Sequence, residues 1–205
     1  MSQPTVIRLP PPSPKGSMAL EVAIAKRRSI RSFTHESISQ SQLSQILWSA
    51  QGIADKTEEY RTVPSAGATY PLEIFVVCGR DSVEKIDAGT YRYIVTSHAL
   101  SLHLTGDQRL DLTRAALGQE YVYEAPVDIV ICAEYERTLI RYGARGERYV
   151  HMEVGHAGQN IYLQATALLL GTVAIGAFHD EQIREVLKLD KRYKPMYIMP
   201  IGKPT

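Results

Sequence analysis

A short cationic segment is the first candidate for chemistry in this 205-residue chain. From Ala25 to Phe33, the sequence AKRRSIRSF places four cationic side chains around one hydroxyl, whereas the whole chain carries 23 Lys and Arg against 22 Asp and Glu. Guanidinium groups hold phosphate through paired, charge-assisted hydrogen bonds. The segment therefore predicts a site for a phosphate monoester. The alternative is a solvated helix end at which the cations offset the helix dipole.

Two segments of small residues could hold a flat ligand against the main chain. PSAGATYP, from Pro64 to Pro71, lacks the lysine of a Walker loop, which disfavours a nucleoside triphosphate. Its N–H groups could donate to ring carbonyls, although an ordinary loop has the same composition. In GTVAIGAF, from Gly171 to Phe178, Gly176 would expose main-chain groups without a side chain in the way, and a tight turn explains it equally well.

Other catalytic groupings are weakly supported. His151 and His156 are five residues apart on a predicted helix, so they do not share a face, and the sequence contains no HExxH motif. We therefore expect no metal site. A serine hydrolase is disfavoured because the chain has no GxSxG motif.

The composition is that of an ordinary globular chain. Hydrophobic residues make up 44%, and a net charge of +1 is too small for a broad nucleic-acid-binding surface. Cys78 and Cys132 lie in apolar segments without a CxxC pair, which indicates buried, reduced thiols and a cytoplasmic location. No apolar run reaches membrane-spanning length, and prolines stand where a signal peptide needs its apolar centre, so no membrane partner is expected.

The elements that must position these groups follow from hydrophobic periodicity. Residues 1–16 are proline-rich and predict an extended arm, either loose or lying on a partner subunit, and residues 17–205 predict a single domain. Helices are expected over residues 18–28, 37–52, 107–118, 153–171 and 180–189. Strands are expected over residues 72–78, 90–95, 100–104, 127–135, 172–178 and 195–202, the second and third forming a hairpin.

The helix expected over residues 37–52 carries the clearest signals. Ser39 and Gln42 have capping-box spacing, and Gly52 is a plausible C-terminal stop. Its apolar face consists of Leu43, Ile46, Leu47 and Ala50. Asp180 is expected to cap the last helix. Helices interleaved with a partly antiparallel sheet predict an α+β layer architecture.

Together, the motifs resemble those of nitroreductase-like flavoproteins. RRSIRSF, PSAGATYP, GQNIYLQATALLLG, VAIGAF and PIGKP follow in the order of that superfamily, over about residues 17–203. ILWSAQGI, ALGQEYVYEAPVDIVI and RYVHMEVGHAGQN resemble its SagB-type dehydrogenase branch. The resemblance implies a nitroreductase-like α+β fold, with a central, mostly antiparallel sheet flanked by helices. It also implies an intertwined homodimer with two FMN molecules at the subunit interface.

The resemblance further implies the residues of a flavin site. The residues expected at the FMN phosphate and ribityl end are Arg27, Ser29, Arg31 and Lys203, with Arg28 facing either that end or solvent. The loop that the partner subunit lays over the flavin ring would consist of Pro64, Ser65, Ala66, Gly67 and Ala68. The main chain of Ile175 and Gly176 would lie near flavin N5. Four polar residues have two interpretations: they line this pocket or the dimer seam, or they are hydrogen-bonded within the core. They are Glu153, His156, Gln159 and Asn160.

The implied activity is hydride transfer through flavin N5, with NAD(P)H as reductant and a small molecule or a peptide as substrate. Azoline-oxidising members of the branch use a Lys-Tyr pair for proton removal, and the matching residues here are Arg141 and Tyr142. Because a guanidinium is a poor base, azoline oxidation is in doubt, and the pair could equally be a surface helix turn. The alternatives are an NAD(P)H-dependent nitro or quinone reductase, and a non-catalytic flavin-binding subunit of a peptide-modifying assembly.

Overall fold

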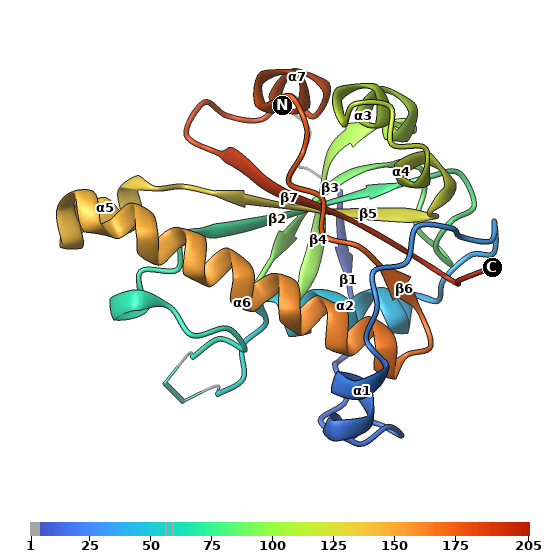
Figure 1. The fold of residues 1–205 in the computed structure, drawn as a ribbon, viewed down its shortest axis with the longest axis horizontal. Helices are drawn as coiled ribbons and strands as arrows, with labels where there is room; N and C mark the ends of the chain where they lie inside the picture. Colours follow the sequence, from blue (N-terminus) through green and yellow to red (C-terminus); the bar gives the residue numbers. More distant parts are fainter. Residues whose placement is uncertain (1–4, 56, 59) are drawn as a thin grey trace.

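The computed structural model describes residues 5–55, 57–58 and 60–205 (Figure 1). Within them, one sheet has the strand order β1-β4-β3-β2-β5-β7-β6, and each pairing of these strands is antiparallel. The strands are β1 (Val6–Arg8), β2 (Leu72–Cys78), β3 (Gly89–Ile94), β4 (Ala99–Thr105), β5 (Val127–Ala133), β6 (Gly171–Thr172) and β7 (Lys194–Gly202). The predicted α+β class, central sheet and hairpin are confirmed.

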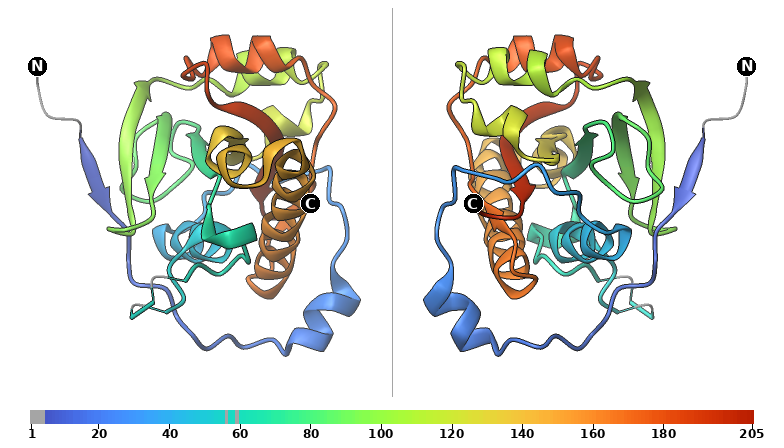
Figure 2. Two further views of the ribbon diagram at one scale, coloured as in Figure 1. Left: turned by 90° about the vertical axis from the view of Figure 1, so that its left-hand side faces the viewer. Right: turned by 90° about the vertical axis from the view of Figure 1, so that its right-hand side faces the viewer.

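Helices cover both faces of the sheet, which gives three layers (Figure 1). The α-helices are α1 (Leu20–Lys26), α2 (Gln40–Gln51), α3 (Arg109–Ala115), α4 (Tyr121–Glu124), α5 (Glu136–Tyr142), α6 (Gly146–Ala167) and α7 (Asp180–Val186). α2 and α6 pack on one face, and α3, α4 and α7 pack on the other. α1 lies on the outer side of the α2–α6 layer, away from the sheet (Figure 2).

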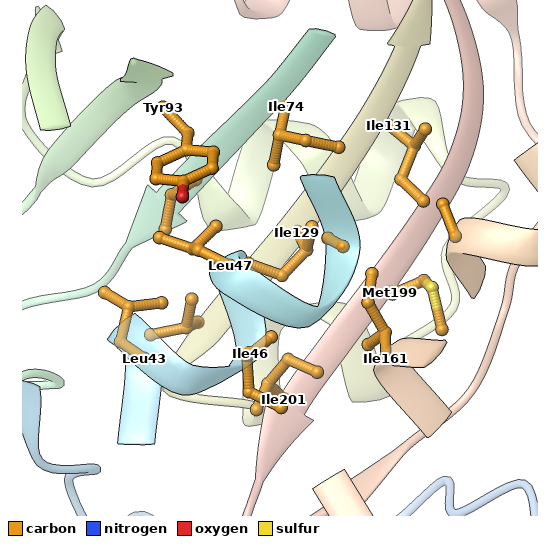
Figure 3. Close-up of a cluster of buried hydrophobic side chains, with 14 of the residues drawn as sticks. Leu43, Ile46, Leu47, Ile74, Tyr93, Ile129, Ile131, Ile161, Met199 and Ile201 are labelled. Carbon is orange, nitrogen blue, oxygen red and sulfur yellow. The ribbon is translucent and has the colours of Figure 1, made fainter. Parts of the chain in front are cut away.

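The larger core cluster lies between the sheet and the α2–α6 layer (Figure 3). Alternation along β5 explains why that central strand is apolar throughout. Ile129 and Ile131 point toward α2 and α6, whereas Val130 and Cys132 join the cluster beneath α3 and α7. The two faces of the sheet therefore bury their apolar side chains in separate clusters, and α2 and α6 are fixed rigidly on one of them.

The predicted capping box of α2 is confirmed. Ser39 Oγ accepts the N–H of Gln42 at 3.1 Å, and Gln42 Oε1 accepts the N–H of Ser39 at 2.9 Å. At the other end, the N–H of Gly52 donates to the carbonyl of Trp48 at 2.7 Å. Both ends of α2 are thereby satisfied, so the helix gives a fixed support for the segment that follows it.

Several boundaries differ from those expected from sequence. α6 begins at Gly146 rather than at residue 153, because Val150 continues the buried face of Val154 and Ala157 into a segment that is otherwise polar. β6 ends at Thr172, since beyond it only Ile175 returns to the sheet, through an isolated bridge to Ile198.

Two further differences concern the start of α7 and the N-terminal arm. The helix α7 has His179 rather than Asp180 as its N-cap, and Asp180 is its first residue. Residues 6–8 of the expected arm are extended, but they pair with β4 of the same chain. The pairing adds an edge strand to the sheet that proline-rich composition did not indicate.

Candidate functional site

The hydroxyl of Tyr162, on α6, connects two of the segments expected to bind a ligand. It lies 2.9 Å from Ser29 Oγ and accepts the N–H of Ala174 at 2.8 Å. The main chains also meet here, because the N–H of Ile30 donates to the carbonyl of Thr172 at 2.9 Å. This arrangement brings the cationic segment, residues 26–31, beside the exposed main chain that follows β6.

The arginines of the cationic segment have different surroundings. The guanidinium carbon of Arg27 lies 5.1 Å from the centroid of the Tyr162 ring, a cation–π contact that directs it toward the same junction. Arg28 turns back on the end of α1 and donates to the carbonyls of Ala25 and Arg27 at 2.9 and 2.7 Å. Arg31 is exposed. Arg27 and Arg31 are therefore the better placed cations for an anionic ligand, and Arg28 satisfies a helix terminus.

The C-terminal end of β7 returns to this segment. The N–H of Thr34 donates to the carbonyl of Lys203 at 2.9 Å, and Pro204 forms a bridge with Phe33. The Lys203 ammonium group forms an ion pair with the half-exposed carboxylate of Glu36. Lys203 is thus near the cationic segment, with part of its charge offset by Glu36.

Gly176 offers open main chain next to the Tyr162 junction. Ile175 is fixed by reciprocal hydrogen bonds with Ile198, of 2.9 and 3.0 Å. Gly176 itself is exposed, and a Cβ built on it would meet only the Tyr197 ring at 3.6 Å, which is ordinary contact. Packing within the described chain therefore does not require glycine here. A flat ligand lying against this backbone would require it, because a side chain would occupy its place.

The loop of residues 64–68 lies elsewhere and is held by α5. Arg141 Nη1 donates to the carbonyl of Gly67 at 2.9 Å, and Thr69 Oγ1 lies 2.8 Å from Thr138 Oγ1. The backbone has left-handed φ angles of 59° at Gly67 and 53° at Ala68. A Cβ on Gly67 would come within 2.5 Å of the Tyr142 hydroxyl. The structure therefore brings Arg141 and Tyr142 against this loop, a juxtaposition that the sequence did not predict.

The two groups of expected site residues are separate within one chain. The loop adjoins α6 near Glu153, whereas the cationic segment adjoins it near Tyr162. Nine helical residues correspond to roughly 13 Å along the axis of α6. The cationic segment and the loop of residues 64–68 of one chain therefore lie at two different places along α6.

A buried polar cluster supports the loop from below. Glu153 is 2% exposed, and burial raises the pKa of its carboxyl to about 7, although the Ser65 hydroxyl and the Arg61 charge act against that shift. Arg61 Nη1 donates to Gln51 Oε1 at 2.7 Å, and its guanidinium lies 4.3 Å from the centroid of the Tyr70 ring. The N–H of Tyr70 in turn donates to Ser65 Oγ at 2.9 Å.

The other polar residues of α6 divide between the interior and the surface. Asn160 Nδ2 donates to the carbonyls of Ser49 and Thr62 at 3.0 and 3.2 Å, so this amide is satisfied within the chain. His156 and Gln159 are exposed. Over the described part of the chain, no group of three or more His, Cys, Asp or Glu side chains could hold a metal ion.

The donor set at the Tyr162 junction fits the phosphate end of a flavin nucleotide. It offers the Arg27 guanidinium, a serine hydroxyl and a nearby ammonium group, it adjoins open glycine backbone, and the exposed Arg31 follows Ser29 by two residues. A cavity of about 750 Å³ lies elsewhere, between residues 13–18, α1, α2 and α6, and its described lining includes Asn160 but neither the cationic segment nor the loop of residues 64–68. None of the described helices is long and apolar enough to cross a membrane.

Comparison with known proteins shows which family this chain resembles. MJ1384 of Methanocaldococcus jannaschii, a protein named as a nitroreductase, is 48% identical over 184 residues, which are 90% of each chain. A solved structure from Ralstonia eutropha JMP134, also named as a nitroreductase, has a TM-score of 0.86 at 28% identity and covers 98% of this chain and 90% of that one.

A second relative is the microcin B17-processing protein McbC of Escherichia coli, 29% identical over 153 residues, or 73% of this chain. The chain spans only 56% of the length of McbC. The structure of the microcin synthetase McbBCD complex with truncated pro-MccB17 bound matches with a TM-score of 0.78 and 27% identity, covering 88% of this chain and 70% of that one. The pattern of the "Nitroreductase family" matches residues 24–203, and its members generally use FMN with NAD(P)H. The chain therefore belongs to the nitroreductase family of oxidoreductases.

Proposed function

We propose that this protein is an FMN-dependent oxidoreductase of the SagB-type branch, in which hydride passes through flavin N5 and NAD(P)H is the reductant. The observation that carries the proposal is the Tyr162 hydroxyl, which joins Ser29 to Ala174 and so sets the cationic segment beside the open backbone of Gly176. Both cysteines are free and buried, in keeping with a reducing cytoplasm.

The chain's own groups would bind and orient the cofactor. Arg27 and Arg31 would hold the phosphate, and Ser29 would add a hydroxyl whose direction is set by Tyr162. The N–H of Gly176, which donates to no described residue, would face the ring. Bound FMN would supply the two-electron hydride chemistry, and the protein would contribute positioning and electrostatics.

The proposed enzyme is a homodimer in which the loop of residues 64–68 covers the flavin of the partner subunit. The separation of the loop from the cationic segment within one chain supports this arrangement. α1 exposes Leu20, Val22 and Ile24 by 61%, 40% and 54%, and exposed apolar residues that gather in a patch mark protein–protein contact sites. On α6, exposed Gly155 has open space around its Cβ position, so another backbone could approach closely.

Two substrate classes follow from different observations. Similarity to a protein named for microcin processing, and to a complex with a peptide bound, favours a peptide substrate. Arg141 favours the second candidate, an NAD(P)H-dependent reductase of nitroaromatics or quinones, because its guanidinium holds the Gly67 carbonyl and cannot act as a base. In either case Arg141 would position the loop, and Tyr142 would be the group available for proton transfer.

Binding of FMN by single-arginine variants tests the proposal. Each charge-assisted phosphate contact contributes about 1.5–3 kcal/mol, so Arg27→Ala and Arg31→Ala should each weaken FMN binding roughly 10- to 100-fold. Arg114→Ala, which removes an exposed arginine paired with Asp111 on α3, is the matched control and should leave affinity unchanged. Equal FMN affinity in all four proteins would contradict the phosphate assignment.

Turnover then separates a catalyst from a flavin-binding subunit. Anaerobic NADH or NADPH should bleach the flavin absorption of the loaded protein, and a quinone or nitroaromatic should restore it. Flavin that stays oxidised with both nicotinamides would favour a non-catalytic subunit of a larger assembly.

A further inference from the structure

The polar cluster beneath the loop contains two buried atoms without partners, although the Glu153 carboxyl as a whole faces the Ser65 hydroxyl and the Gln51 amide. Glu153 Oε1 and Gln51 Nε2 are buried, and neither forms a hydrogen bond with any residue that the structure describes. Leaving a buried donor or acceptor unpaired is costly, so native proteins seldom do so without a reason. α6 nevertheless presents a carboxyl group at this point, directly below Ser65.

The charges around Glu153 come from three elements. The segment that precedes the loop supplies Arg61, the one cation among the described residues that affects the Glu153 carboxyl, and α2 supplies the neutral amide of Gln51. From β2, Glu73 faces Arg61 as well, but it is paired with Arg92 and Arg137 at 2.8 and 2.6 Å. Arg61 therefore lies between two carboxyl groups. Glu73 has other cationic partners, whereas Glu153 has no cation other than Arg61 among the described residues.

Arg61 also contacts the loop through Tyr70. Its guanidinium covers the ring of Tyr70, whose backbone has a left-handed φ of 45° and whose N–H donates to Ser65 Oγ. Ser65 and Tyr70 bracket the left-handed turn at Gly67 and Ala68. A shift of the guanidinium would thus reach both ends of the turn that faces the ligand.

We propose that Glu153 is a positioning residue whose proton controls the conformation of the loop of residues 64–68. Neutral Glu153 leaves Arg61 with Gln51 and Tyr70, and the loop keeps the described conformation. Ionised Glu153 draws the guanidinium toward itself, away from Gln51 and Tyr70, and the loop loses its support. This inference rests on the proposed function, since it makes FMN affinity fall as the pH rises.

Burial strengthens the inference, because it raises the pKa of Glu153 to about 7. A carboxyl with its ordinary pKa would be ionised throughout the neutral range and could not act as a switch there. The proton is bound below neutrality and released above it, so the supported loop is the low-pH form.

The test is the pH profile of FMN binding in wild type, Glu153→Gln and Asp128→Asn. Asp128 is the control because it is also fully buried without partners, yet it pairs with Val77, at the far end of β2 from the loop. We expect equal wild-type and Glu153→Gln dissociation constants at about pH 5.5, and wild-type binding roughly tenfold weaker at about pH 8.5. The titration of the FMN phosphate affects both proteins equally, so it cancels in the ratio of the wild-type to the Glu153→Gln dissociation constant. Asp128→Asn should follow the wild-type profile.

A second readout keeps this inference distinct from the proposed function. Amide hydrogen exchange of residues 61–71, corrected for intrinsic rates, should speed up above neutral pH in the wild type without any FMN, but not in Glu153→Gln. If no variant binds FMN, the proposed function fails while this readout still decides the role of Glu153. Should Glu153→Gln not fold, Arg61→Gln should likewise flatten the profile. A wild-type-to-Gln ratio that is constant with pH, together with unchanged exchange, would overturn the inference.

Discussion

Replacing Tyr162 with phenylalanine removes one oxygen atom from the point where α6, the cationic segment and residues 174–176 meet. The hydroxyl lies 2.9 Å from Ser29 Oγ and accepts the N–H of Ala174 at 2.8 Å. A typical hydrogen bond contributes about 0.5–1.5 kcal/mol, and a donor left unpaired costs about 1–3 kcal/mol. Because Ser29 is exposed and can turn to water, the Ala174 N–H dominates. We therefore expect the free energy of unfolding to fall by about 2 kcal/mol.

Thermal unfolding and FMN titration measure the two consequences. For a chain of this size, 1 kcal/mol corresponds to roughly 2–4 °C, so the melting temperature should fall by about 4–8 °C. FMN should bind roughly tenfold more weakly, because Ser29 and the backbone at Gly176 are no longer held in one arrangement. Tyr123→Phe is the matched control, since that tyrosine is 48% exposed on α4, away from the Tyr162 junction.

Two outcomes would refute this reasoning in different ways. A variant that melts and binds FMN like the wild type would show that the hydroxyl organises nothing. A variant that melts earlier but binds FMN equally well would leave the hydrogen bonds as structural contacts and would remove residues 174–176 from the site.

Further predictions concern the loop and the second face of the sheet. Gly67→Ala should lower the free energy of unfolding by about 1–2 kcal/mol because the backbone is left-handed there. It should also weaken FMN binding, because the new Cβ would collide with the Tyr142 hydroxyl. Gly118→Ala, at a φ of 72° with open space around it, is the control and should show only the backbone effect in thermal unfolding. Asp128→Asn should remove a pH dependence of stability. Burial holds the pKa of Asp128 well above its ordinary value, so wild-type stability is fully present below the unfolded-state pKa and declines as pH rises through the folded one. Urea midpoints at about pH 5 and pH 8 should differ less for Asp128→Asn than for the wild type, and the difference that remains should come from Glu153, whose pKa is also raised; an equal decline in both proteins would exclude Asp128 as a source.

Local signals in the sequence were sufficient to predict much of the fold. Ser39 and Gln42 specify the start of α2 because both partners of the capping box lie within one turn. The apolar composition of residues 72–78 and 127–133 specifies central strands, since both of their faces are covered. The start of α6 was missed because residues 146–152 are mostly polar, and the contacts that support the helix there, such as that of Gly146 with Leu139 of α5, are tertiary.

The candidate site could be read only in part, because its contacts join distant positions. The motifs indicated Arg27, Ser29 and Gly176, but no local pattern shows that Tyr162 binds Ser29 from 133 residues away. The Arg141 contact with Gly67 likewise spans 74 residues. A tyrosine within the mostly apolar stretch NIYLQATALLLG is the signal that could have indicated a buried polar contact on that helix.

Hybrid dimers test the central claim, that each flavin is held by the cationic segment of one subunit and covered by the loop of the other. One parent carries Arg27→Ala with Arg31→Ala, the other carries Ala66→Trp to crowd the ring, and neither homodimer should retain FMN. In a hybrid, a shared site would combine the intact arginines of one chain with the intact loop of the other. We predict one FMN per isolated hybrid dimer, measured by its visible absorption. Hybrids that remain colourless in excess FMN would contradict the account, because every site would then depend on a single chain.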